Sequence, residues 1–65
     1  MTKAEQKQVD KATVHGRGAL LRTLAVIHRA GSSRTQREVM NMITEANASD
    51  EFTIVGSALL HNSEV

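Results

Sequence analysis

The chain lacks cysteine, tyrosine and tryptophan, and its 65 residues include a single phenylalanine. Without cysteine, neither a disulfide bond nor a thiolate metal site can form. With Phe52 as the sole aromatic ring, the chain offers no platform on which bases of a single-stranded nucleic acid would stack. No uninterrupted apolar stretch approaches the roughly 18 residues that a transmembrane helix needs, and no secretory signal is visible. We therefore expect a soluble, cytoplasmic protein that does not enter a membrane.

The sequence also lacks the motifs of common active sites. The three histidines, His15, His28 and His61, are far apart, and neither His-Glu-x-x-His nor Gly-x-Ser-x-Gly occurs. His15 and His28 neighbour arginines, whose positive charge disfavours a metal cation. A chain of this length has little interior for a ligand pocket of the usual size. We therefore expect no enzymatic activity, no catalytic residue, no metal site, no cofactor and no small-molecule substrate.

Positive charge is confined to the first part of the chain. Residues 1–37 hold all eight Lys and Arg with two acidic residues, for a net charge of +6, whereas residues 38–65 hold five acidic residues and no Lys or Arg. Three interpretations are open. The two halves face each other, within one chain or across an antiparallel dimer; the basic half meets an anionic partner; or both are solvated faces without a partner.

The densest apolar run of the sequence lies between Gly18 and Gly31. A capping box formed by Thr2 and Glu5 predicts that a helix begins close to the amino terminus. Gly16 and Gly18 each weaken a helix by about 1 kcal/mol, so a bend at this point is one interpretation. The amphipathic pattern stays in phase across both glycines, which favours one long helix. On that helix the apolar face comprises Val9, Thr13, Gly16, Leu20, Leu24 and Ile27.

A second helix is predicted over residues 34–46. Gly31 suits the left-handed position that ends the preceding helix, and Ser33 with Gln36 forms another capping box. Met40 falls off the apolar face and is available to fill a gap or to contact another chain. The apolar face of this helix comprises Thr35, Val39, Met42, Ile43 and Ala46.

Residues 50–60 admit two interpretations. Ser49 is a good N-cap, and Asp50 and Glu51 suit the first turn of a helix. Phe52–Val55, however, is a run of aromatic and branched residues typical of a β-strand. As a strand, this run would have no partner within the chain and would pair only between chains. We therefore favour a short third helix.

The predicted fold is all-α, either a helical hairpin or a three-helix domain. Residues 1–61 form this single domain and residues 62–65 form a flexible tail. A chain of this size buries only about 60% of its unfolded surface, so its core is marginal. Without disulfides or metal, self-association or a partner protein is the expected source of further stability.

Protein–protein binding explains most of these features together. A line of small residues beside the apolar face of the first helix would let another helix approach closely, and several large apolar residues fall outside the core. We therefore expect a small non-enzymatic regulatory or adaptor protein that binds another protein, acting as a homodimer. The expected partner-binding residues are Ala12, Gly16, Ala19, Thr23, Met40, Ile54 and Leu60.

Sequence-independent nucleic-acid binding is the alternative function. A basic stripe on the first helix is the type of cluster that contacts phosphates. The order of the helices also permits a helix-turn-helix, but its recognition helix would be residues 50–60, whose leading carboxylates repel a phosphate backbone. The residues expected to bind nucleic acid are Lys7, Lys11, Arg17, Arg22 and Arg29.

Overall fold

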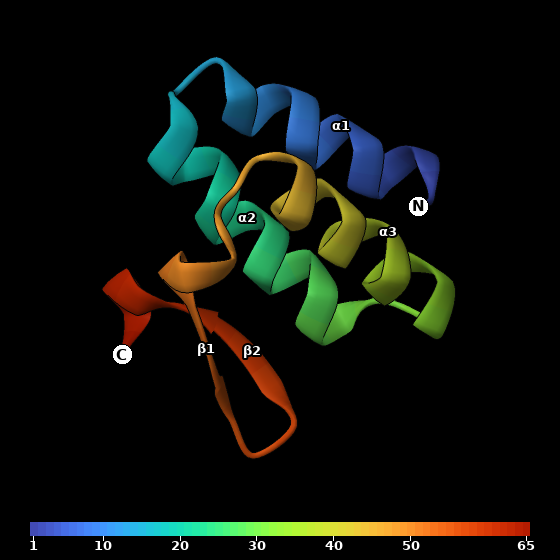
Figure 1. Cartoon of the computed structure of the whole chain (residues 1–65). Helices are drawn as coiled ribbons and strands as arrows, with labels where there is room; N and C mark the ends of the chain where they lie inside the picture. Colours follow the sequence, from blue (N-terminus) through green and yellow to red (C-terminus); the bar gives the residue numbers. More distant parts are fainter.

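The computed structural model describes all 65 residues and shows three helices followed by a β-hairpin (Figure 1). The prediction of a mostly helical domain is confirmed, but the fold is not purely all-α. No helix is both long enough and apolar enough to cross a membrane. In chain order the elements are α1 (Lys3–Thr13), α2 (Arg17–Ala30), α3 (Ser33–Glu45), the 3₁₀ turn η1 (Ser49–Glu51), β1 (Phe52–Val55), β2 (Ala58–His61) and the 3₁₀ turn η2 (Asn62–Glu64).

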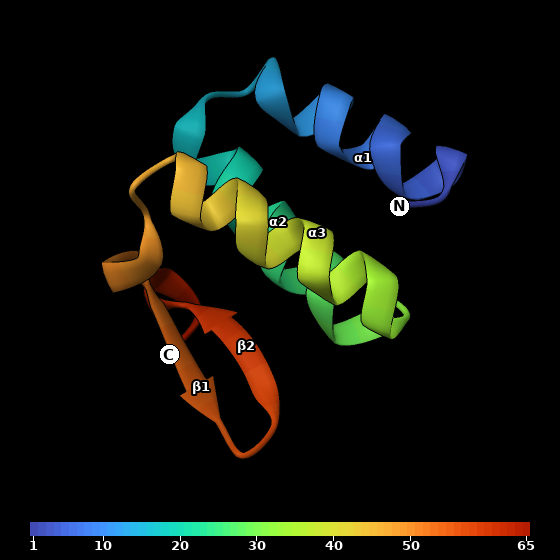
Figure 2. The same cartoon turned by 45° about the vertical axis from the view of Figure 1, so that its right-hand side comes forward.

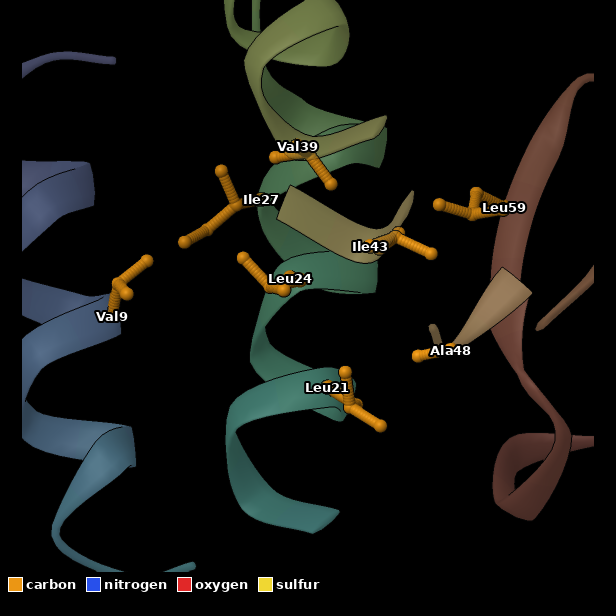
Figure 3. Packing of buried hydrophobic residues seen from close by; sticks show 8 residues of the cluster. All are labelled: Val9, Leu21, Leu24, Ile27, Val39, Ile43, Ala48 and Leu59. Atoms are coloured by element: carbon orange, nitrogen blue, oxygen red, sulfur yellow. The ribbon is translucent and has the colours of Figure 1, made fainter. Parts of the chain in front are cut away.

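Helix α2 lies at the centre of the fold. α1, α3 and β2 each pack chiefly against α2, and both views show α1 and α3 running in the direction opposite to α2 (Figures 1 and 2). Figure 3 shows that α1 and β2 extend core side chains toward α2 from opposite sides. The core cluster comprises Val9, Leu21, Leu24, Ile27, Val39, Ile43, Ala48 and Leu59.

The prediction of one long first helix is wrong, because the chain breaks between α1 and α2. α1 ends at Thr13, and Gly16 has φ 97° and ψ 174°, a conformation that is essentially restricted to glycine. The break resets the helical phase. Leu21, outside the predicted apolar face, is 1% exposed, whereas Leu20, which was expected on that face, is half-buried.

The predicted helix starts are confirmed for α1 and wrong in detail for α3. Glu5 N–H donates to Thr2 Oγ1 (3.1 Å) and Thr2 N–H donates to Glu5 Oε1 (2.8 Å), which completes the capping box. Ser32, one residue earlier than expected, caps α3 by accepting from Thr35 N–H. Gly31 is extended (φ −89°) rather than left-handed. Glycine is needed there because a Cβ would lie 2.6 Å from Thr35 Cγ2.

The predicted apolar face of α3 is largely confirmed. Thr35, Val39 and Ile43 are buried and Met42 is half-buried, since these residues recur at helical spacing along the side that meets α2. Ala46 lies just beyond the helix and is exposed. α2 and α3, joined by the two residues between them, form a helical hairpin.

Residues 50–60 contain a β-hairpin, so the predicted third helix is wrong. β1 pairs antiparallel with β2, and Ile54 lies opposite Leu59. The expectation that β1 would find no strand within the chain failed because Ala58–His61 supplies one. Gly56 has φ 65°, and a two-residue loop with glycine in this region is typical of hairpins. One face of β2 is buried against α2, which holds the hairpin in place.

The carboxy-terminal residues, expected as a flexible tail, include the short helix η2. One guanidinium nitrogen of Arg29 donates to the Leu59 carbonyl at 2.8 Å, and the other lies 3.1 Å from Glu64 Oε2. Glu64 Oε1 also accepts from His61 N–H at 3.0 Å. Arg29 therefore joins α2 to both β2 and η2.

Replacing Gly16 with alanine should lower the free energy of unfolding by about 1–3 kcal/mol, because a Cβ is strained in this conformation. Gly18→Ala is the matched control. Gly18 is helical, and an added Cβ would meet only the end of the Arg22 side chain, at 3.2 Å. Its stability should be unchanged or raised by up to about 1 kcal/mol. Urea denaturation followed by circular dichroism measures both, and equal losses would contradict the placement of the break at Gly16.

Candidate functional site

A groove of about 530 Å³ lies between α1 and α2, on a side to which α3 contributes no lining residue. Each helix lines it with residues at spacings i, i+3, i+4 and i+7, which share one helix face. Most of the surface inside the groove is apolar. The lining residues are Gln8, Lys11, Ala12 and His15 from α1 and the turn after it, Ala19, Arg22, Thr23 and Val26 from α2, and Glu64.

The floor of the groove consists of small side chains. Ala12 is buried, and Ala19 and Thr23 are half-buried. Val26, 50% exposed, extends this apolar surface along α2. Because the distance between packed helices depends on the side chains at the contact, short side chains let a further helix come close. The structure thus brings together three of the predicted partner-binding residues.

The rim of the groove is positive. Lys11 and Arg22 are exposed, and neither forms an ion pair within the chain. His15 also lines the groove, and the one lining carboxylate, that of Glu64, is paired with Arg29. The free charges at the groove are therefore positive.

The other predicted partner-binding residues do not line this groove. Gly16 is exposed in the link between α1 and α2, and Met40, 39% exposed, lies on α3. Ile54 on β1 is 68% exposed and Leu60 on β2 is half-buried. The predicted set is therefore divided between the groove, the outer face of α3 and the hairpin.

Opposite charges in the two parts of the sequence meet within the single chain. Arg17 lies 2.7 Å from Glu51 Oε2, Arg29 lies 3.1 Å from Glu64 Oε2, and the amino-terminal ammonium lies 2.6 Å from Glu38 Oε1. Each of these ion pairs joins residues far apart in sequence. This arrangement supports the first of the three interpretations of the charge pattern.

The basic stripe expected on one helix is divided between two. Lys7 and Lys11 lie on α1 and Arg22 and Arg29 lie on α2, which runs in the opposite direction (Figures 1 and 2). Arg17 and Arg29 have carboxylate partners within the chain. Residues 50–60, which would be the recognition helix of a helix-turn-helix, contain the β-hairpin instead, so that version of nucleic-acid binding is wrong.

Four lining residues, Gln8, His15, Val26 and Glu64, were not among the residues predicted to bind a partner or nucleic acid. The matching spacings 8-11-12-15 and 19-22-23-26 are the signal that would have identified the two helical walls. That signal was hidden because both segments were placed on one continuous helix. No feature of the sequence predicts that Glu64 lines the groove, because it reaches the groove only through its long-range pair with Arg29.

Three titratable groups have shifted pKa values. Burial lowers the pKa of His28, whose Nδ1 is buried without a hydrogen-bond partner. The hydrogen bond from the Thr2 backbone lowers the pKa of Glu5, and the hydrogen bond from Arg29 lowers that of Glu64. No group of three or more His, Asp or Glu side chains is close enough to hold a metal ion.

No protein family, curated protein or solved structure matches this chain.

The free energy of unfolding should fall as the pH is lowered from about 7 to about 5. In the folded protein the pKa of His28 lies below its ordinary value of 6.5. The neutral ring of His28 therefore contributes its full stability above the pKa it has in the unfolded chain, and this contribution is lost as the pH falls through its pKa in the folded protein. Glu5 and Glu64, with pKa values below 4.5, lose their contributions in the same direction but only in stronger acid.

Denaturation at several pH values measures this dependence. His28→Gln should flatten the stability profile between about pH 7 and about pH 5, whereas His15→Gln, at an exposed histidine, is the control and should keep the profile of the unmodified protein. A His28→Gln variant with an unchanged profile would contradict the assignment.

Proposed function

We propose that this chain is a small non-enzymatic regulatory or adaptor protein that binds a helical segment of another protein in the α1–α2 groove. The observation that carries this proposal is the position of the small-residue floor between two exposed, unpaired cations. Ala12, Ala19 and Thr23 form that floor, and Lys11 and Arg22 are the cations.

A helix fits the shape of this groove better than an extended peptide does. Two antiparallel helices form a trough into which a third helix can pack, with its ridges between theirs. An extended peptide adds most favourably to a sheet edge, where its backbone is hydrogen-bonded. The walls of the groove are helices, whose backbone N–H and C=O groups already bond within each helix. They therefore offer an extended peptide no backbone hydrogen bonds.

The charge of the rim indicates the chemistry of the partner. Lys11 and Arg22 have long aliphatic stems that can cover apolar surface while their charged ends stay in water. A partner helix with apolar residues at i, i+3, i+4 and i+7 and with Asp or Glu beside them would match both the floor and the rim. The partner class is therefore an acidic amphipathic helix.

The same groove supports binding more than catalysis. Its volume falls in the range of small-molecule sites, about 300–1,000 Å³, but such sites enclose most of the ligand and direct a few polar groups at it. This groove is an open trough whose polar lining residues, apart from Thr23 in its floor, are exposed.

Nucleic-acid binding is the second candidate, favoured by Lys7, Lys11 and Arg22, which are the three of the five predicted residues that have no carboxylate partner. With three phosphate contacts, the slope of log K for binding against log salt concentration would be only about −2 to −3. Arg17 and Arg29 are paired with carboxylates within the chain, so fewer free cations remain than the sequence led us to expect. The structure therefore supports this function less well than protein binding.

Homodimerisation, the remaining part of the expected function, requires a self-complementary surface. The groove does not provide one, because its rim is positive on both copies.

A display library of helical peptides, selected against the protein, should enrich apolar residues at i, i+3, i+4 and i+7 flanked by Asp or Glu. Ala19→Trp, which fills the groove, should weaken binding of a selected peptide by about tenfold or more. Ala4→Trp is the control, since Ala4 is an exposed alanine of α1 outside the groove. Equal binding by both variants would contradict the proposal.

Fluorescence polarisation with a labelled DNA duplex or RNA hairpin tests the alternative. We expect weak binding that depends little on Ala19. Tight binding that falls steeply between about 50 mM and about 200 mM salt, and that Arg22→Glu abolishes, would favour nucleic acid over the helical peptide.

A further inference from the structure

The outer edge of β1 is open. The sheet has two strands, and β1 pairs only with β2. Thr53, Ile54 and Val55 are all exposed, and Ile54 is 68% exposed. Both views show the turn of the hairpin projecting away from the helices (Figures 1 and 2). No part of the chain therefore covers this edge.

The backbone of Ile54 faces that open edge. In an antiparallel pair of strands, residue pairs that exchange hydrogen bonds alternate with pairs whose N–H and C=O groups point outward. The carbonyl oxygen of Leu59, the partner of Ile54, accepts a 2.8 Å hydrogen bond from the guanidinium of Arg29, outside the sheet. The Ile54–Leu59 pair is thus of the outward-pointing kind, and the N–H and C=O of Ile54 are directed away from β2.

The usual devices that block an exposed strand edge are missing. Natural proteins protect such edges with lysine and other charges, with proline, with bulges or with a covering segment. Residues 52–60 contain no charged residue and no proline, and the β1–β2 register is continuous without a bulge. An uncharged edge of branched side chains is suited to pairing with another strand.

We infer that two copies of this chain pair antiparallel through β1 and form a four-stranded sheet in the order β2-β1-β1-β2. Centring the two-fold axis on Ile54 lets its outward-pointing N–H and C=O bond to those of Ile54 of the partner subunit. Ile54 then lies opposite Ile54 of the partner subunit, and Thr53 lies opposite Val55 of the partner subunit. This surface is separate from the groove, so the inference does not depend on the proposed helical partner.

Charge favours the antiparallel direction. Asp50 and Glu51 precede β1; Glu51 is paired with Arg17, whereas Asp50 carries a negative charge with no partner in the chain. In the register centred on Ile54, Glu51 lies opposite Ser57 of the partner subunit, so the acidic residues meet the uncharged hairpin turn. A parallel pairing would instead place the carboxylates of the two copies side by side, which is unfavourable.

The assembly closes at two copies. The outer edge of β2 is covered, since the Leu59 carbonyl accepts from Arg29, so each chain has one open edge to offer. An interface that is the same on both subunits and leaves no further edge forms a dimer rather than a filament. Four-residue strands bury a small area, which is typical of weak, reversible association.

Sedimentation equilibrium from low to high micromolar concentration should show a reversible monomer–dimer equilibrium. Ile54→Lys should raise the dimer Kd by about tenfold or more, because it places two like charges at the axis. Val14→Lys is the control, since Val14 is 83% exposed and lies outside the hairpin. A monomer at every concentration, or equal effects of the two lysines, would overturn the inference.

Cross-linking tests the register, because the chain has no cysteine of its own. A mixture of Thr53→Cys and Val55→Cys chains should form disulfide-linked heterodimers on mild oxidation, whereas either variant alone should cross-link much less. Equal cross-linking in all three samples would overturn the register. Ala19→Trp should dimerise normally and Ile54→Lys should bind the selected helical peptide normally. A dimer lost in Ala19→Trp but kept in Ile54→Lys would overturn the interface while leaving the groove as a binding site.

Discussion

Burial of one face of α2 is the interaction on which the rest of the structure depends. Leu21, Leu24 and Ile27 are each at most 2% exposed, and each contributes roughly 1.5–3 kcal/mol when it is fully buried. α1, α3 and β2 pack chiefly on α2 rather than on one another. A chain this small cannot cover every side of that assembly. It leaves two surfaces of different chemistry, a positively charged trough of small residues and a neutral strand edge.

Local signals in the sequence identified most of the helical structure. The pairing of Thr2 with Glu5 and the apolar spacing along α3 needed no long-range contact to be recognised. The break at Gly16 was missed because the amphipathic phase happens to continue across it. The hairpin was missed for a different reason: Ala58–His61 has little intrinsic strand preference, and its conformation depends on packing against α2. The glycine at position 56 was the one local sign of the turn.

The candidate groove was predictable only in part. Ala12, Ala19 and Thr23 were identified as small residues on one face of a helix, and the structure shows them on two facing helices. The cations were harder to place, because a wheel of one helix gives Arg22 and Arg29 the same role. Arg29 is paired and Arg22 is free because Glu64, which lies 35 residues after Arg29, meets Arg29 in the folded chain.

The contacts of Arg29 have a consequence for regulation. Glu64 neutralises this guanidinium and also lines the groove, so the positive charge at that end is masked only while η2 is folded against α2. Unfolding of this last turn would leave a further cation beside Lys11 and Arg22. The proposed binding of an acidic helix would then oppose the ordering of the carboxy-terminal turn, because linked equilibria of opposite sign weaken each other.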